Sequence, residues 1–260
     1  MPRYRLVRSL PISRQSPEEW TGEDRMSNDG RSVVPQTKMR RAIARAMSLS
    51  KSAAPHFYVS TEVTMSAALS ALEEVNTGRR REQRASLTAL LIRFVALTLA
   101  EEPRFNAHYT DEGHVLVDDI NVGVAIALDE GLIAPALLDC AGLGVTEISE
   151  RLRDLSHRAR EGRLRAAEMM GATFTVSNLG MYDVSSFAAI VNPPQVAILA
   201  TGRTMSRPVV VDGDVVVRPV MTTTLSADHR AIDGVDAARF LGLFKARIEN
   251  PSRLGAEDDV

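Results

Sequence analysis

The sequence predicts a single α/β sandwich domain built on a mixed β-sheet. Helical and strand patterns alternate along the chain without an internal repeat. One long segment is apolar almost throughout, as in a buried helix, and several β-branched runs are separated by turn residues. With 260 residues, 45% of them hydrophobic and 25% charged, the chain is long enough for one large domain, or for one domain and a tail.

Charge and composition exclude several classes of partner. The formal net charge of -2 gives no broad electrostatic case for binding nucleic acid or an anionic membrane. No apolar run approaches the ~20 residues of a membrane span, and the Arg-rich start lacks the apolar core of a signal peptide. The single cysteine, Cys140, excludes an internal disulfide, so we expect a cytoplasmic protein. The histidine spacing matches no metal site, so no metal is expected.

The two ends of the chain differ in pattern from the middle. Residues 1–34 are punctuated by proline, asparagine and glycine and are expected to form a tail or an arm, with a short strand at 3–10 as an alternative. Residues 255–260 form an acidic tail. The predicted domain therefore covers residues 35–254.

Apolar spacing predicts four helices before the last third of the chain. In the first, Met39, Ile43 and Met47 lie four residues apart. Thr64 is the predicted N-cap of the second. The third is nearly all apolar, which indicates a buried helix. It is too short and too interrupted to span a bilayer. The fourth has one apolar and one charged face. The predicted helices cover residues 37–52, 65–75, 87–101 and 145–161.

Short β-branched or apolar runs predict the strands. An Asp-Gly-Asp turn at 212–214 predicts a hairpin, and Gly131 and Pro135 predict a bend. The strands are expected at residues 57–63, 105–109, 115–117, 122–128, 174–176, 196–199, 209–211, 215–217 and 220–225.

The last strand leads into His229, which is followed by Asp233, Gly234 and a helical pattern. A histidine at a strand-to-helix junction is held by the sheet and can still face a cleft. Its near-neutral pKa suits a general base. A purely structural role is equally compatible with these residues.

Four segments, in order and at similar spacing, resemble the catalytic core of the dihydrolipoamide acyltransferases. These are the E2 components of 2-oxoacid dehydrogenases, related to chloramphenicol acetyltransferase. The resemblance implies a chloramphenicol acetyltransferase-like two-layer sandwich with a mixed sheet, assembled as a homotrimer with active sites between subunits. The segments are 39–44 with 54–57, 121–125 with 131–135, 173–180 with 191–194, and the His-x-x-x-Asp-Gly motif within 225–241.

The same resemblance assigns the reaction. His229 would act as the general base that deprotonates a thiol or hydroxyl attacking an acyl thioester of coenzyme A. Ser177 would donate a hydrogen bond to the oxyanion, although alone it would be taken for a hydroxyl near a turn. The acyl group would move directly, without an acyl-enzyme. The histidine tautomer would be fixed by a backbone contact.

Roles follow for five further residues. Asp233 could contact the imidazole as in a Ser-His-Asp arrangement. The resemblance instead implies an organising role, with Arg40 or Arg41 as its salt-bridge partner. Asn178 is expected to bind coenzyme A or to shape its loop, and Gly234 to permit close backbone approach at the helix start.

Some features depart from the E2 pattern. The sequence has no Asp-Lys pair of the kind that carries lipoyl, so no covalent lipoyl is expected on this chain. The acidic tail is a poor docking hook, because burying unpaired carboxylates is costly, which predicts an isolated trimer.

Three functions remain open. The first is a stand-alone acetyltransferase acting on a small-molecule hydroxyl, as in tetronate natural-product biosynthesis. The second is an E2 core acting on dihydrolipoyl groups carried by a separate chain. The third is a non-catalytic trimeric scaffold.

Overall fold

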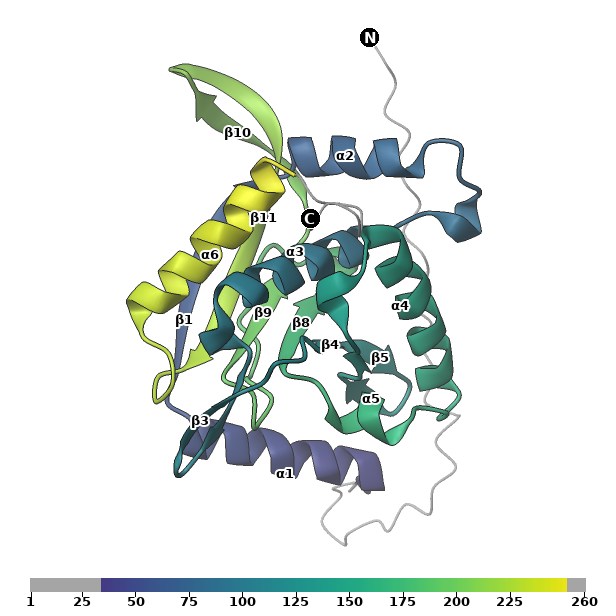
Figure 1. The fold of residues 1–260 in the computed structure, drawn as a ribbon, viewed down its shortest axis with the longest axis vertical. Helices are drawn as coiled ribbons and strands as arrows, with labels where there is room; N and C mark the ends of the chain where they lie inside the picture. The colour runs from purple at the N-terminus through teal and green to yellow at the C-terminus, as the bar shows by residue number, and fades with distance from the viewer. Residues whose placement is uncertain (1–33, 252–260) are drawn as a thin grey trace, which may run out of the picture. The chain divides into compact units, whose positions relative to one another are not determined.

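The computed structural model describes residues 34–251 (Figure 1). Contacts within the chain divide it into residues 1–37 and residues 38–260, and the helices and strands described below belong to the second unit. The tail predicted for residues 1–34, the strand alternative at 3–10 and the acidic C-terminal tail lie outside the described residues, apart from residue 34.

A seven-stranded mixed sheet forms the centre of the domain. Its order is β1-β11-β9-β8-β4-β7, with β10 paired to β11. Strand β8 is parallel to both of its neighbours, and the other pairs are antiparallel. This arrangement confirms the predicted α/β fold with a mixed sheet. The strands are β1 (His56–Thr64), β4 (Val122–Val124), β7 (Ala136–Leu137), β8 (Phe174–Asn178), β9 (Ala197–Thr201), β10 (Met205–Val211) and β11 (Asp214–Asp228).

Two small sheets lie apart from the main one. The first pairs β2 (Ala107–Thr110) with β3 (Gly113–Leu116), and the second pairs β5 (Ile126–Leu128) with β6 (Gly131–Ile133). The strand predicted at 122–128 is therefore wrong as one element, because the chain leaves the main sheet at Ala125. The bend predicted between Gly131 and Pro135 instead begins with strand β6.

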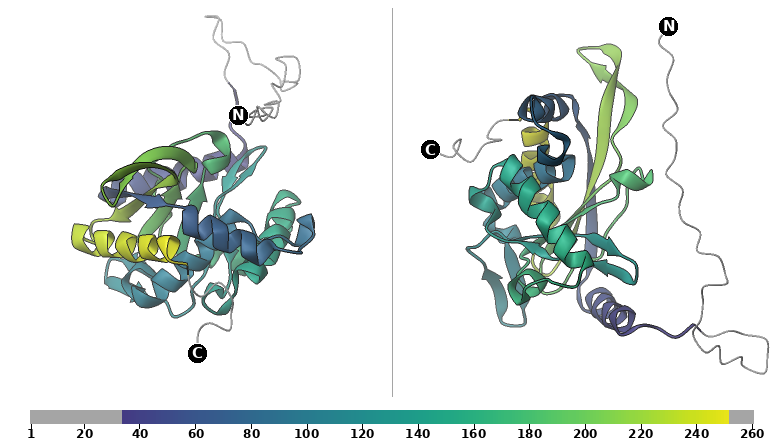
Figure 2. Two further views of the ribbon diagram at one scale, coloured as in Figure 1. Left: turned by 90° about the horizontal axis from the view of Figure 1, so that it is seen from above. Right: turned by 90° about the vertical axis from the view of Figure 1, so that its right-hand side faces the viewer.

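Strand β11 is longer than the two strands predicted for its residues. It runs without a break because Pro219 keeps its place in the ladder opposite Ser206, and the Pro219 carbonyl accepts the N–H of Met65. Strands β10 and β11 form a hairpin that projects from the rest of the domain (Figures 1 and 2).

Helices α3, α4 and α6 pack on one face of the main sheet (Figure 2). The bounds of α3 match the prediction, and the Ser86 hydroxyl caps its start by accepting the N–H of Ala89 at 3.1 Å. Thr64 is not the N-cap of α2, because the helix begins one residue later, after Met65. The helices are α1 (Lys38–Ala53), α2 (Ser66–Asn76), α3 (Leu87–Glu101), α4 (Val145–Arg160), α5 (Ala166–Met170) and α6 (Gly234–Glu249), with short 3-10 helices at Arg81–Gln83, Pro103–Phe105, Cys140–Gly142 and Gly180–Tyr182.

The apolar helix α3 and the turn before it have the length and composition of a membrane span, over 21 residues, contrary to the sequence-based expectation. Of its most apolar window, 61% is buried inside the domain. That burial fits a core helix, since α3 contacts both α4 and α6.

Aromatic rings connect the sheet to the helix that follows His229. Phe240 of α6 lies 4.6 Å from the ring of Phe105 and 5.5 Å from that of Phe174, measured between centroids. All three residues are fully buried. Strand β8 is thereby fixed against α6, and burial of such rings contributes most of the stability of a core.

An ion-pair cluster fixes α5, which the sequence did not predict, against α4. Glu168 is 2% exposed, and Arg158 donates to both of its carboxylate oxygens at 2.6 and 2.8 Å. The backbone N–H and the guanidinium of Arg165 also donate to it. These contacts lower the pKa of Glu168 to about 2, with the hydrogen bonds from Arg158 as the largest cause.

We expect Glu168→Gln to lower the free energy of unfolding by about 1–3 kcal/mol, because the carboxylate charge is lost and an amide N–H donor replaces one of the two oxygens that accept from the guanidinium groups. Since folding lowers this pKa, the contribution is full above the ordinary glutamate range and is lost as pH falls toward about 2. Urea unfolding at several pH values measures both effects. The exposed Glu150→Gln is the matched control. Equal stabilities of the two variants would contradict this prediction.

Candidate active site

Ser177 lies near the carboxyl end of β8, the central parallel strand. Phe174 and Val176 point into the core, so Thr175 and Ser177 point to the opposite face of the sheet. The Thr175 hydroxyl is occupied, since it donates to the Gln195 side chain at 2.7 Å. Within residues 34–251 the Ser177 hydroxyl makes no hydrogen bond, although the residue is only 7% exposed. It is therefore available to donate to a bound group.

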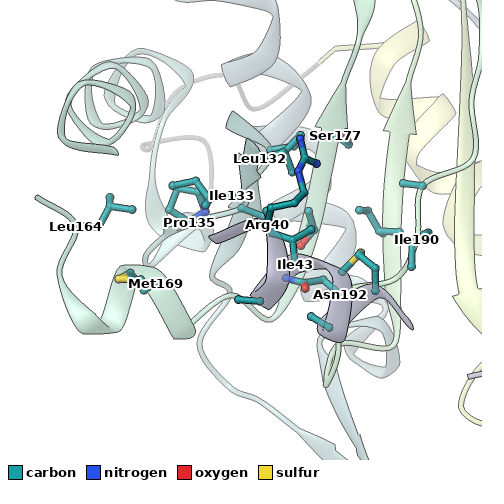
Figure 3. Close-up of a pocket in the computed structure, with 18 residues that line it drawn as sticks. Arg40, Ile43, Leu132, Ile133, Pro135, Leu164, Met169, Ser177, Ile190 and Asn192 are labelled. Carbon is teal, nitrogen blue, oxygen red and sulfur yellow. The ribbon is translucent and has the colours of Figure 1, made fainter. Parts of the chain in front are cut away.

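A pocket of about 540 Å³ opens over Ser177 (Figure 3). Its walls are mainly apolar, and Arg40 of α1 reaches up beside Ser177. The chain segments that line it come from α1, β6, α5, the loop before β9, and the sheet itself. Labelled lining residues are Arg40, Ile43, Leu132, Ile133, Pro135, Leu164, Met169, Ser177, Ile190 and Asn192.

His229 follows directly after β11, and a hydrogen bond of its own backbone holds it in place. Its N–H donates to the Pro55 carbonyl at 2.9 Å, and its ring packs on that of Phe57 with centroids 4.6 Å apart. The residue is exposed, and within the described residues its ring nitrogens make no hydrogen bond. The backbone contact expected to fix the tautomer is therefore not present in this chain. Both nitrogens remain open to a substrate.

An ion pair that the sequence analysis missed surrounds His229. Asp228 is 2% exposed and accepts the guanidinium of Arg230 through both of its oxygens. The Arg230 guanidinium also lies 3.7 Å from the centre of the Tyr109 ring. An acidic and a basic residue on either side of the histidine are visible in the sequence and could have suggested an ion pair. The fold shows that the two side chains do pair and that they stabilise the turn that carries His229.

Asp233 is the N-cap of α6. One of its carboxylate oxygens accepts the N–H groups of Val235 and Asp236 at 2.9 and 3.0 Å. These hydrogen bonds, that from Asp236 first, place the pKa of Asp233 below its ordinary value, and the charges of Arg104 and His229 add to this. The carboxylate makes no hydrogen bond to His229 in the described chain. The carboxylate caps the start of α6, a contact that the prediction did not name.

The salt bridge predicted between Asp233 and Arg40 or Arg41 is not formed. The helix N–H groups are the nearer partners of the carboxylate, and both arginines lie on α1, where Arg40 lines the Ser177 pocket. The close approach predicted at Gly234 is also absent from the described part of the chain, because a Cβ there would meet no atom outside the neighbouring residues and the local helix backbone within 4 Å.

Asn178 joins the loop after β8 to the start of α3. Its side chain accepts the N–H of Gly180 at 2.8 Å and donates to the Thr88 hydroxyl at 3.1 Å. These contacts favour loop shaping over coenzyme A binding, the alternative left open from the sequence.

We expect Asp233→Ala to lower the melting temperature, and Asp233→Asn to stay close to wild type, because asparagine also caps helices. The carboxylate's extra charge stabilisation is present above the ordinary aspartate range and is lost as pH falls below it, since the folded-state pKa is lowered. Thermal melting of the three proteins at neutral and acidic pH measures this. Identical melting of Asp233→Ala and wild type would refute the capping role.

Ser177 and His229 lie at opposite ends of the sheet in one chain. Ser177 is level with Ala200 of β9, and Ala200 with Thr224 of β11, while His229 comes five residues further on. Strand rise and spacing then put them about 20 Å apart. One chain therefore does not bring the predicted base and oxyanion donor together.

Among residues 34–251, no three histidine, cysteine, aspartate or glutamate side chains gather as metal ligands. The Cys140 thiol is buried, and burial raises its pKa to about 12. It is therefore not a nucleophile at neutral pH.

Comparison with known families decides the affiliation. The 2-oxoacid dehydrogenases acyltransferase family (catalytic domain) matches residues 28–256. The chain belongs to this family. It is 35% identical over 224 residues to the dihydrolipoyllysine-residue acetyltransferase component of the Rickettsia bellii pyruvate dehydrogenase complex, covering 85% of this chain and 54% of that one. It is 37% identical over 229 residues to the mouse mitochondrial pyruvate dehydrogenase protein X component, and this match covers 85% of this chain and 45% of that one. The chain thus spans about half the length of these relatives.

Solved structures agree with this family. A probable dihydrolipoamide acetyltransferase of Listeria monocytogenes gives a TM-score of 0.81 at 30% identity, covering 89% of this chain and 98% of that one. The Azotobacter vinelandii dihydrolipoamide acetyltransferase gives a TM-score of 0.79 at 27% identity, and the match covers 84% of this chain and 91% of that one. That enzyme was studied for the catalytic role of a serine, a histidine and an asparagine. Chloramphenicol acetyltransferase, at 17% identity and a TM-score of 0.50 over 79% and 92%, shares the fold, which confirms the predicted fold class.

Proposed function

We propose that this protein transfers an acetyl or other short acyl group between coenzyme A and a dihydrolipoyl thiol. One observation carries the proposal. The serine and histidine studied in the Azotobacter enzyme are separated by the same number of residues as Ser177 and His229. Its asparagine, four residues after the histidine, falls at the position of Asp233. This support favours the dihydrolipoyl acceptor over the small-molecule hydroxyl of the tetronate hypothesis.

In the proposed reaction, His229 removes the proton of the attacking thiol as its sulfur adds to the acyl thioester carbonyl. The Ser177 hydroxyl donates to the oxyanion of the tetrahedral intermediate. When the intermediate collapses, the bond to the first sulfur breaks, and the His229 imidazolium returns the proton to the leaving thiolate. No electron is gained or lost, and no acyl-enzyme forms.

The reaction requires a second copy of the chain, since His229 and Ser177 are about 20 Å apart within one. We propose a trimer in which each active site takes His229 from one copy and Ser177 from the next. The projecting hairpin supports assembly, because one of its faces carries exposed valines that a neighbouring copy would cover: Val210, Val215 and Val217, at 69–73% exposure.

An acceptor panel tests the proposal. The protein is incubated with acetyl-CoA and either dihydrolipoamide or hydroxylated small molecules, and free thiol and products are followed by mass spectrometry. We expect S-acetyl-dihydrolipoamide. Transfer only to hydroxyl acceptors would replace the proposal with the small-molecule function, and transfer to nothing by a folded protein would favour the scaffold.

A further inference from the structure

The short segment that joins α1 to β1, together with the first residue of β1, contacts both halves of the site. The Pro55 carbonyl accepts the backbone N–H of His229 at 2.9 Å. The next residue, His56, contacts the Ala54 carbonyl through Nδ1 at 2.8 Å, and its Nε2 accepts the N–H of Val191 at 3.0 Å. This short segment therefore holds the turn of His229 on one side and the loop before β9 on the other.

Val191 lies between two residues that line the Ser177 pocket, Ile190 and Asn192, and is itself 1% exposed. Its carbonyl accepts the Ser50 hydroxyl at 2.6 Å, so both of its backbone polar groups are bound by side chains. Two distant elements, α1 through Ser50 and β1 through His56, fix this stretch of wall.

The contacts of His56 require a neutral ring. Since Nδ1 faces a carbonyl, it carries the proton, and Nε2 is then the acceptor for the Val191 N–H. If Nε2 also carried a proton, its N–H would face the N–H of Val191, and neither group could accept a hydrogen bond from the other. The bond to Val191 would break, and a buried N–H would lose its acceptor.

The charged surroundings of His56 are already paired. Across the strand pair it faces Asp228, which is bound by Arg230. On its own strand lies Tyr58, whose hydroxyl accepts Lys51 of α1. The wall segment 189–192 carries no ionisable side chain. No unpaired carboxylate among these groups would hold the imidazolium in place.

We infer that His56 is a positioning residue that holds the wall of the Ser177 pocket only while its ring is neutral. It does not touch the reacting atoms. Its effect on catalysis rests on the proposed function, and its effect on the wall does not. When the ring takes up a second proton at acidic pH, the wall loosens and the substrate binds more weakly.

Three variants test the kinetic consequence. His56→Leu removes the acceptor, and we expect KM to rise about threefold to tenfold with little change in kcat. His56→Gln keeps an acceptor that does not titrate, so KM stays near wild type. Ser50→Ala removes the hydroxyl that donates to the Val191 carbonyl, and we expect it to raise KM while His56 stays in place. His157→Gln, on the exposed side of α4, is the control.

The pH profile separates positioning from general destabilisation. Acyl transfer requires a neutral His229, and a second proton on His56 would lower kcat/KM further, by the threefold to tenfold expected for His56→Leu. This further fall should be absent in His56→Gln and should remain in Ser50→Ala. Unchanged KM in His56→Leu, or the same further fall in His56→Gln, would overturn the inference.

Hydrogen exchange of residues 188–195 decides the structural part without any activity. We expect faster exchange at Val191 in His56→Leu, and in wild type a rise at acidic pH, beyond the intrinsic rate, that is absent in His56→Gln. Equal exchange in all three proteins would overturn the inference even if catalysis is found. If the wild type transfers no acyl group, the proposed function fails, and this measurement still decides the role of His56.

Discussion

His229→Ala should lower kcat for acyl transfer to dihydrolipoamide by about 10²–10⁴, the usual contribution of a general base. Without the imidazole, the attacking thiol must lose its proton to water. Substrate binding depends on other groups, so KM should change little. Steady-state kinetics with acetyl-CoA measure both constants.

The loss must be separated from damage to the fold. The ring of His229 packs on Phe57, so His229→Gln, which keeps bulk at the site, is the second variant. Both proteins should melt close to wild type, because the residue is exposed and its backbone N–H still binds the Pro55 carbonyl. His157→Ala, on a surface helix, should keep full activity. Wild-type turnover by His229→Ala would remove the base from the mechanism.

Local signals in the sequence predicted the bounds of helices α1 to α4 to within one residue, while the short helix α5 was missed. Helix α3 has the predicted bounds because Ser86 caps it and Pro103 follows it, and both signals lie within a few residues of the ends. The apolar stripe of α6 is likewise buried, as Ala237, Leu241 and Phe244 show. Such elements depend on contacts three or four residues apart, which a single sequence displays.

Strand bounds depend on partners far away in the sequence. The break at Ala125 and the continuity of β11 through Pro219 are set by which strands lie beside them, and the local pattern does not contain that information. The same reason explains the site. His229 and Asp233 were found from their spacing and the resemblance, while the Arg230 contact with Tyr109 and the His56 bond to Val191 join residues more than a hundred positions apart.

Ser177→Ala should lower kcat by about 10²–10³, as expected for the loss of one oxyanion donor. The fold should tolerate the change, because within the described residues the hydroxyl has no hydrogen bond to lose. Thr175→Val, on the same face of β8, is the contrasting variant. It removes a hydroxyl bonded to Gln195 and should reduce stability more than Ser177→Ala does. Wild-type kcat in Ser177→Ala would exclude the serine from the reaction.

Mixing the two inactive proteins tests whether the site is shared. If every site takes its histidine from one copy and its serine from the next, co-refolded His229→Ala and Ser177→Ala chains form some sites with both groups intact. In randomly mixed trimers with cyclic symmetry, about one quarter of the sites meet this condition, so about a quarter of wild-type activity should return. A site built within one chain would regain none, since each chain then keeps its own defect. The recovered fraction therefore distinguishes the two arrangements, because it counts the sites in which both groups are intact.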